Sequence, residues 1–191
     1  MDYAGALKSA LAIAAACVCI ASHGASLESG VAAPQLRSRT LDGQAFDLRN
    51  LHGRVVVVNF WATWCAPCVA ELPSLARLRD RLHIDLVAVN FQENAVRIGS
   101  FLDQLNMALQ VVRDHDGTLR AAWHVDVFPS TFVVDRDGRI AFVASGEVDW
   151  DDPAIQAMID RLKTARPGRQ VAFLSTCARL FLHTIAANPN D

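Results

Sequence analysis

One stretch of the sequence decides the fold: Val55-Val56-Val57-Val58-Asn59-Phe60-Trp61-Ala62-Thr63-Trp64-Cys65-Ala66-Pro67-Cys68. Its apolar first half predicts a buried strand. The chain continues as Val69-Ala70-Glu71-Leu72-Pro73-Ser74-Leu75-Ala76-Arg77-Leu78, which we interpret as a helix. Two cysteines with two residues between them therefore lie at a strand-to-helix junction, which is typical of a dithiol/disulfide switch.

The spacing of the two cysteines has a physical reason. If Cys65 opens the helix, Cys68 lies three residues further on the same face, where the two sulfurs can close a disulfide with little backbone movement. Free N–H groups and the positive end of the helix dipole favour a thiolate at Cys65, and a thiolate is the attacking species in exchange. Pro67 falls in the first turn, where its missing N–H is tolerated. The pattern indicates thiol–disulfide exchange.

Other uses of the cysteine pair stay open at this point. Half of a zinc site would need two more Cys or His ligands at close spacing, and Cys17, Cys19 and Cys177 do not supply them. A purely structural disulfide would close a very short loop and stabilise the chain little. The same two thiolates could hold Cu(I) and pass it to a partner, since soft sulfur ligands suit that ion. We expect no resident metal and no other cofactor.

The residues around the pair carry a resemblance to the TlpA/ResA-like branch of the thioredoxin superfamily, within the redoxin/AhpC-TSA-like group. These are membrane-tethered or periplasmic thiol–disulfide oxidoreductases. The resemblance runs from about Ala33 to about Lys163 and rests on three segments: 57–73, 127–135 with 137–140, and Gly146 with Asp149-Trp150. It implies an α/β thioredoxin fold, with a mixed central sheet flanked by helices, an extra N-terminal hairpin and a strand–helix insert.

The resemblance also implies the catalytic residues. Cys65 and Cys68 would form the redox disulfide and carry the reaction. Glu71, three residues after Cys68, would lie beside the active site, raise the pKa of the Cys68 thiol by like-charge repulsion and relay its proton. The alternative for Glu71 is an ordinary solvated carboxylate on a helix.

A second set of residues would bind the substrate. Pro129 matches the cis-proline that faces the cysteines in this family, although the residues alone would favour a trans bond. The backbone of Phe128 would then be free to pair with an extended substrate peptide. Trp64 would pack beside Cys65 and line the same surface.

Strands and helices alternate along the rest of the chain. We expect a short edge strand at 44–48, further strands at 54–60, 84–90, 110–113, 131–134 and 140–145, and helices at 67–82, 94–106, 118–123 and 152–163. Asp135-Arg136-Asp137-Gly138 predicts a hairpin, and we expect Asp152 to be the N-cap of the last helix. Residues from about 90 to 113 would form the insert.

The net charge limits the functions that we consider, and the two ends of the chain indicate its domain organisation. The formal net charge of −2 and the absence of a Lys/Arg block argue against nucleic-acid binding. Residues 10–21 are small and apolar, too few to span a membrane comfortably, so 1–25 is predicted to be a signal peptide, with an uncleaved membrane anchor as the alternative. We expect a thioredoxin-like domain at 33–164 and an atypical C-terminal extension at 165–191, whose Cys177 has no assigned role.

The residues between the cysteines bear on the direction of electron flow. A histidine there would stabilise the thiolate and favour an oxidant, whereas Ala66-Pro67 gives no such help. We therefore expect a periplasmic reductase of protein disulfides, with a thiol oxidase as the alternative. Such an enzyme needs a donor, because the glutathione and thioredoxin pools are cytosolic. The resemblance implies a membrane thiol-electron donor, and as partners the cysteines of apocytochrome c or of copper-site assembly proteins.

Overall fold

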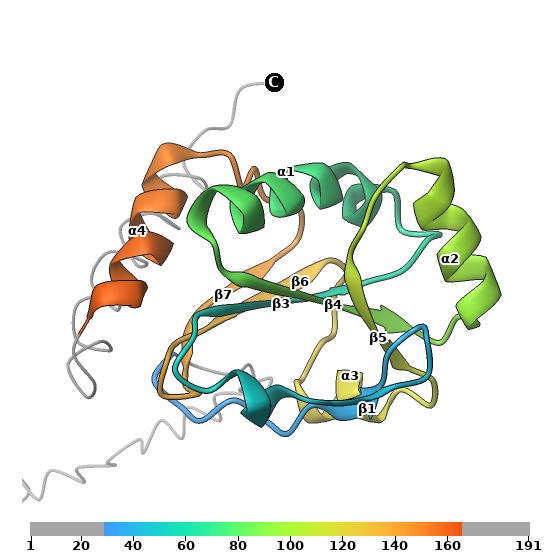
Figure 1. Cartoon of the computed structure of the whole chain (residues 1–191), viewed down its shortest axis with the longest axis horizontal. Coiled ribbons are helices and arrows are strands. Elements are labelled where there is room, and N and C mark those ends of the chain that lie inside the picture. Colours follow the sequence, from blue (N-terminus) through green and yellow to red (C-terminus); the bar gives the residue numbers. More distant parts are fainter. Residues whose placement is uncertain (1–28, 166–191) are drawn as a thin grey trace, which may run out of the picture.

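The computed structural model describes residues 29–165 and shows a five-stranded mixed sheet (Figure 1). The strand order is β5-β4-β3-β6-β7. The strands are β3 (Val56–Trp61), β4 (Asp85–Phe91), β5 (Gln110–Asp114), β6 (Ser130–Val134) and β7 (Ile140–Ser145). The first three run parallel, β6 runs antiparallel to β3, and β7 pairs antiparallel with β6. This is the thioredoxin-like α/β arrangement that the sequence predicts.

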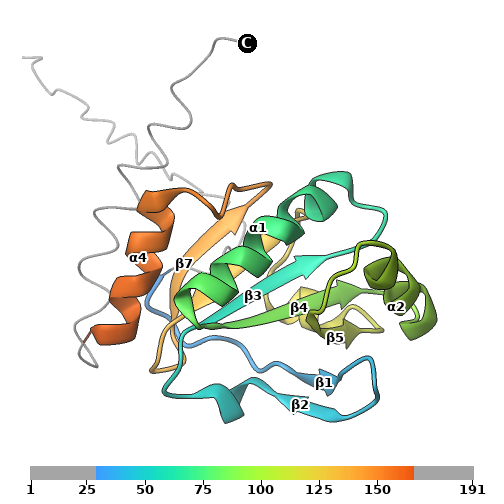
Figure 2. The same ribbon diagram turned by 45° about the horizontal axis from the view of Figure 1, so that its top comes forward.

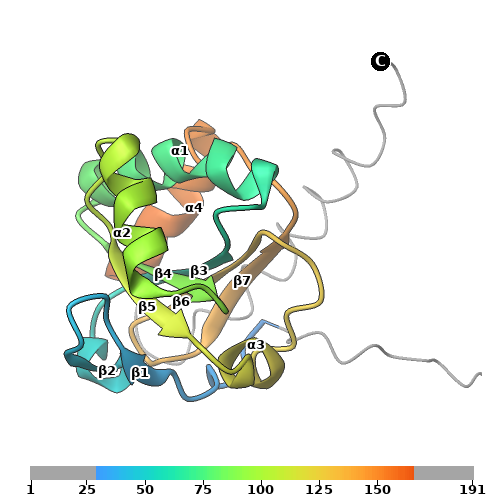
Figure 3. The same cartoon turned by 90° about the vertical axis from the view of Figure 1, so that its right-hand side faces the viewer.

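Helices and a hairpin cover the two faces of the sheet. Three helices lie on one face: α1 (Ala66–Leu82), α2 (Ala95–Gln104) and α4 (Pro153–Thr164) (Figure 2). The other face carries the short helix α3 (Thr118–Ala122), a 3-10 turn η1 (Leu48–Leu51) and a separate hairpin of β1 (Arg37–Arg39) and β2 (Ala45–Asp47). Figure 3 shows the sheet edge-on between these two layers. Each face has its own apolar cluster.

The side chains of β3 point alternately to the two faces of the sheet, and burial of both sets explains why this strand lies at the centre of the sheet. All six of its residues are buried. Val57 and Trp61 pack with the α1 layer, whereas Val56, Val58 and Phe60 pack with the opposite layer. Asn59 has the parity of Val57 and Trp61, so its polar side chain is directed into the α1 layer.

The expected elements agree with the structure to within two residues at each end. The short strand expected at 44–48 is β2, which among residues 29–165 pairs only with β1 and so forms the extra hairpin that the resemblance implies. The predicted insert consists of α2 and β5, and Asp152 caps α4 through bonds from the Ala154 and Ile155 N–H groups. The expected signal peptide at 1–25 lies outside the described residues, and so does the expected C-terminal extension at 165–191, with Cys177, apart from its first residue. Within residues 29–165, every helix is too short or too polar to cross a membrane.

Candidate functional site

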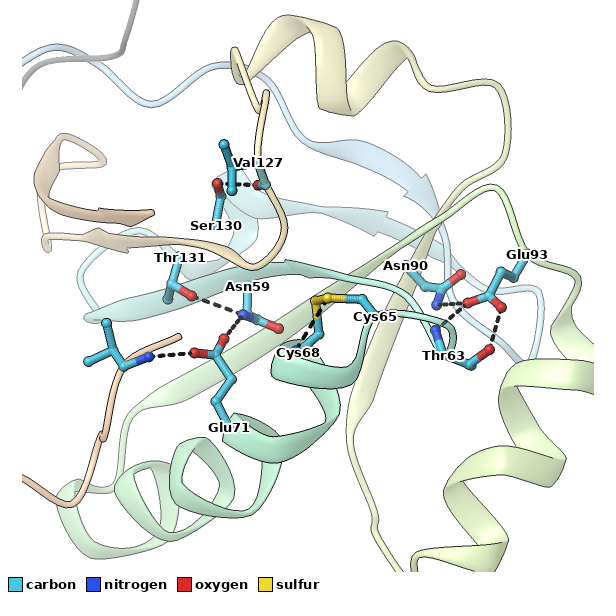
Figure 4. The surroundings of a disulfide bond; sticks show 11 residues. Asn59, Thr63, Cys65, Cys68, Glu71, Asn90, Glu93, Val127, Ser130 and Thr131 are labelled. Atoms are coloured by element: carbon cyan, nitrogen blue, oxygen red, sulfur yellow. Dashed lines mark hydrogen bonds between the residues drawn. A yellow bond between two sulfur atoms is a disulfide. The ribbon is translucent and has the colours of Figure 1, made fainter. Parts of the chain in front are cut away.

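The cysteine pair sits where β3 gives way to α1. The strand ends at Trp61, and a turn over 62–65 is closed by the Cys65 N–H donating to the Ala62 carbonyl (3.2 Å). Cys65 is the N-cap of α1, and its Sγ accepts from the Cys68 N–H at 3.3 Å. The two residues form a disulfide (Figure 4). Cys65 is 6% exposed and Cys68 is fully buried, so an incoming partner can reach only the first sulfur.

Glu71 is buried on the same helix, and this overturns the alternative of a solvated carboxylate. It is 2% exposed, and Figure 4 shows it further along α1 than Cys68 and pointing toward Asn59. Its Oε1 accepts from the Asn59 Nδ2 (2.7 Å), and its Oε2 accepts from the Val148 N–H (3.2 Å) and the Trp150 Nε1 (3.3 Å). Burial raises the pKa of Glu71 to about 7, against these three hydrogen bonds, which lower it.

Asn59 links this carboxyl group to the strand that follows the proline loop. Its Nδ2 donates to the Glu71 Oε1 and also to the Thr131 Oγ1 (2.9 Å), while its Oδ1 has no hydrogen-bond partner among the described residues. A neutral Glu71 would need an acceptor for its proton, and rotation of the Asn59 amide would supply one. The network can therefore hold Glu71 in either protonation state.

The proline loop lies across the site from the cysteines. The Phe128–Pro129 bond is cis, as the family resemblance implies. The Ser130 hydroxyl donates to the Val127 carbonyl at 2.7 Å within this loop. The Phe128 ring packs edge-on to Trp64, with centroids 5.8 Å apart, so the loop and the cysteine turn are in contact. Trp64 is 60% exposed and Val127 is 53% exposed, which leaves an apolar surface beside Cys65.

Sequence reasoning missed the partners of Glu71. Thr131 and Trp150 are far from it along the chain, and only the fold brings them to Asn59 and the carboxyl group. One signal was available: Asn59 is the single polar residue in an otherwise apolar strand. Sequence reasoning also missed Glu93, whose buried carboxylate accepts a hydrogen bond from the turn before Cys65.

The arrangement supports proton-coupled exchange between two sulfurs. One sulfur can be reached at a helix N-terminus, the other is enclosed, and a carboxyl group with a pKa near 7 can take up or release a proton at neutral pH. The described residues contain no group of three or more His, Cys, Asp or Glu side chains placed to hold a metal ion.

Comparison with known proteins agrees with this chemistry. The family model described as Redoxin matches residues 28–159. The chain is 29% identical over 147 residues to the thiol-disulfide oxidoreductase ResA of Bacillus subtilis (strain 168), covering 75% of this chain and 79% of the relative. It is 32% identical over 127 residues to the thioredoxin-like protein YneN of the same organism, covering 63% and 73%.

A solved structure extends the comparison to the fold. A protein of Chlorobium tepidum, named as a putative thiol:disulfide interchange protein DsbE, superposes with a TM-score of 0.66 at 27% identity. The match covers 72% of this chain and 99% of that one, so nearly the whole of that protein is similar in fold to the domain described above.

Proposed function

Because the chain belongs to the Redoxin family and is a thiol–disulfide oxidoreductase, we propose that it reduces disulfides in partner proteins outside the cytoplasm. The observation that carries this proposal is the unequal burial of the two cysteines beside a carboxyl group with a pKa near 7. Cys65 is the nucleophile, Cys68 is the resolving cysteine, and Glu71 exchanges the proton.

The reaction begins with the reduced protein. The Cys65 thiolate attacks one sulfur of the substrate disulfide, which forms a mixed disulfide and releases the first substrate thiolate. Cys68 then loses its proton to Glu71 and attacks the Cys65 sulfur. This step forms the Cys65–Cys68 disulfide and releases the second substrate thiolate. Two electrons pass from the dithiol to the substrate. The Cys68 proton passes through Glu71 to the second departing thiolate, and the first departing thiolate takes a proton from solvent, which replaces the one that Cys65 released when it became a thiolate.

The exposed apolar surface supports a role in substrate binding. Trp64 and Phe128 are in ring contact next to Cys65, and Pro129 follows Phe128 in the loop across from it. We assign these three residues to binding the extended segment that carries the substrate disulfide, with the Phe128 backbone pairing to it as an added strand.

The proposed direction of electron flow and the proposed location of the protein are both based on the sequence. Ala66-Pro67 offers no hydrogen-bond donor from a side chain to stabilise the thiolate, which favours a reductant. In this proposal residues 1–25 direct export or anchor the chain, 33–164 form the thioredoxin-like domain, and 165–191 extend it. A membrane thiol-electron donor re-reduces Cys65–Cys68, and the substrates are the cysteines of apocytochrome c or of a copper-site assembly protein.

The reduction potential of the Cys65–Cys68 pair tests the proposal. The full chain with Cys177→Ser is equilibrated in graded thiol buffers, quenched with acid and labelled with a mass-tagging alkylator. A potential of about −250 mV or lower is expected for a reductase. A potential of about −120 mV would make the protein an oxidase of thiols. Failure of the pair to cycle would favour transfer of Cu(I) by the same thiolates.

A further inference from the structure

A second buried carboxylate lies near the cysteines, on the connection between β4 and α2. Glu93 is 8% exposed, and each of its oxygens accepts two hydrogen bonds. Its Oε2 accepts from the Thr63 N–H (2.7 Å) and the Asn90 Nδ2 (2.8 Å). Its Oε1 accepts from the Thr63 hydroxyl and the Arg97 Nε (2.8 Å). Figure 4 shows Glu93 and Thr63 facing each other beside Cys65.

These four bonds join three segments at one point. Asn90 is in β4, Arg97 is in the first turns of α2, and Thr63 is in the turn that ends in Cys65. Within the described residues, two side chains from outside the turn hydrogen-bond to positions 62–64, those of Glu93 and Arg97. The Arg97 Nε donates to the Thr63 hydroxyl at 2.9 Å. The insert therefore holds the turn that carries the nucleophile.

The carboxylate is suited to hold the turn because it remains charged. Burial raises the pKa of Glu93, but the bonds from Thr63, Asn90 and Arg97 outweigh burial and lower it below its usual range. Hydrogen bonds to an ionised acceptor are stronger than neutral ones, so the turn is fixed firmly.

We propose that Glu93 is a positioning residue for Cys65, which holds the 62–65 turn so that the Cys65 sulfur stays at the N-terminus of α1. The inference rests on the proposed function, since positioning matters only if Cys65 is the nucleophile. Its consequence concerns the thiolate. A sulfur held against the free N–H groups of α1 is stabilised as an anion, and a sulfur on a loosened turn is not.

Two physical effects of Glu93 on Cys65 have opposite signs, and this makes the proposal testable. If Glu93 acted only through its charge, removing that charge would lower the pKa of the Cys65 thiol, because a nearby anion disfavours a thiolate. If Glu93 acts by positioning, Glu93→Gln raises that pKa. The glutamine side chain cannot accept all four bonds, because its amide group would meet donors.

The experiment measures the Cys65 pKa in the full chain with Cys68→Ser. Iodoacetamide labelling is followed across pH on the Cys65 peptide by mass spectrometry, which separates it from the other cysteines. We expect Glu93→Gln to raise the pKa enough to reduce the thiolate fraction at neutral pH about three- to ten-fold. Thr63→Val, which removes one donor, should shift it in the same direction by less, and it serves if Glu93→Gln does not fold.

Asp135→Asn is the matched control. Asp135 is also a buried carboxylate (3% exposed) that accepts from backbone N–H groups, those of Asp137 and Arg139, but it follows β6 at the opposite end of the sheet from Cys65. The Asp135→Asn substitution should leave the pKa of the Cys65 thiol unchanged. An unchanged or lowered pKa in Glu93→Gln and Thr63→Val would overturn the proposal. Inability of the wild-type chain to reduce insulin would instead refute the proposed function. The two failures can be told apart, because the labelling experiment measures the Cys65 pKa without any substrate.

Discussion

Replacing Glu71 with glutamine should remove a component of the pH dependence of stability. Glu71 is almost fully enclosed, and burial raises its pKa from 4.5 to about 7. Between these two pH values the folded protein binds a proton at Glu71 that the unfolded chain has released. The free energy of unfolding therefore falls as pH rises through this window, because the folded state binds more protons. The stabilisation is complete below about pH 4.5 and is lost as pH passes 7.

The size of the effect follows from the difference between the two pKa values. Since one pKa unit corresponds to about 1.4 kcal/mol, the free energy of unfolding should fall by up to about 3 kcal/mol between pH 4.5 and roughly 8. Glutamine has the shape of the neutral carboxyl group and does not titrate. Rotation of the Asn59 amide, whose Oδ1 has no partner within residues 29–165, lets that oxygen accept from the amide group of the introduced glutamine.

Guanidinium unfolding of the oxidised protein at closely spaced pH values across this window provides the measurement, because the disulfide keeps the active-site thiols from titrating. The wild-type free energy minus that of Glu71→Gln isolates the Glu71 component from the histidines, which both proteins share. A difference that stays constant with pH would refute the assignment of a raised pKa to Glu71, and with it the role of this residue as the proton acceptor.

Three further predictions concern the same site. Asn59→Ala removes a donor to the Glu71 carboxylate, so the midpoint of the pH-dependent stability change should move to higher pH; a midpoint at or below the wild-type value would contradict the hydrogen bond. Cys68→Ser should accumulate a mixed disulfide with a substrate protein on non-reducing gels, whereas Cys65→Ser should form none, because Cys65 alone is within reach of a partner. Phe128→Ala removes the ring contact with Trp64 and should raise the KM for a protein substrate about two- to ten-fold with little change in the reduction potential. An equal change in KM for a small disulfide such as oxidised glutathione would argue against a docking role.

The sequence predicts the parts of the site that depend on local structure. Cys65 at a helix start, Cys68 on the same face and the strand before them follow from spacing and periodicity within one segment. The cis bond before Pro129 follows from family resemblance alone, because the local preference is trans. The burial of Glu71 could not be predicted this way, since Trp150 and Val148 reach it only after α4 and the preceding loop pack against α1.

The partner strand of β2 and the role of Glu93 could not be predicted from the local sequence. The residues of β2 alone do not identify their partner strand, because β1 has three residues, too few to give a periodic signal. Glu93 looks like an ordinary polar residue after a strand. Its importance appears only once Thr63 from a neighbouring strand end and Arg97 from α2 lie against it.

The distribution of the four tryptophans makes the protein its own optical reporter. Trp61, Trp123 and Trp150 are fully buried, and Trp64 is 60% exposed beside Cys65. A collisional quencher such as iodide therefore reaches one indole only, the one at the mouth of the site. When a partner protein settles over Cys65, it should shield that indole, so docking and release can be followed by quenching of intrinsic fluorescence without a label.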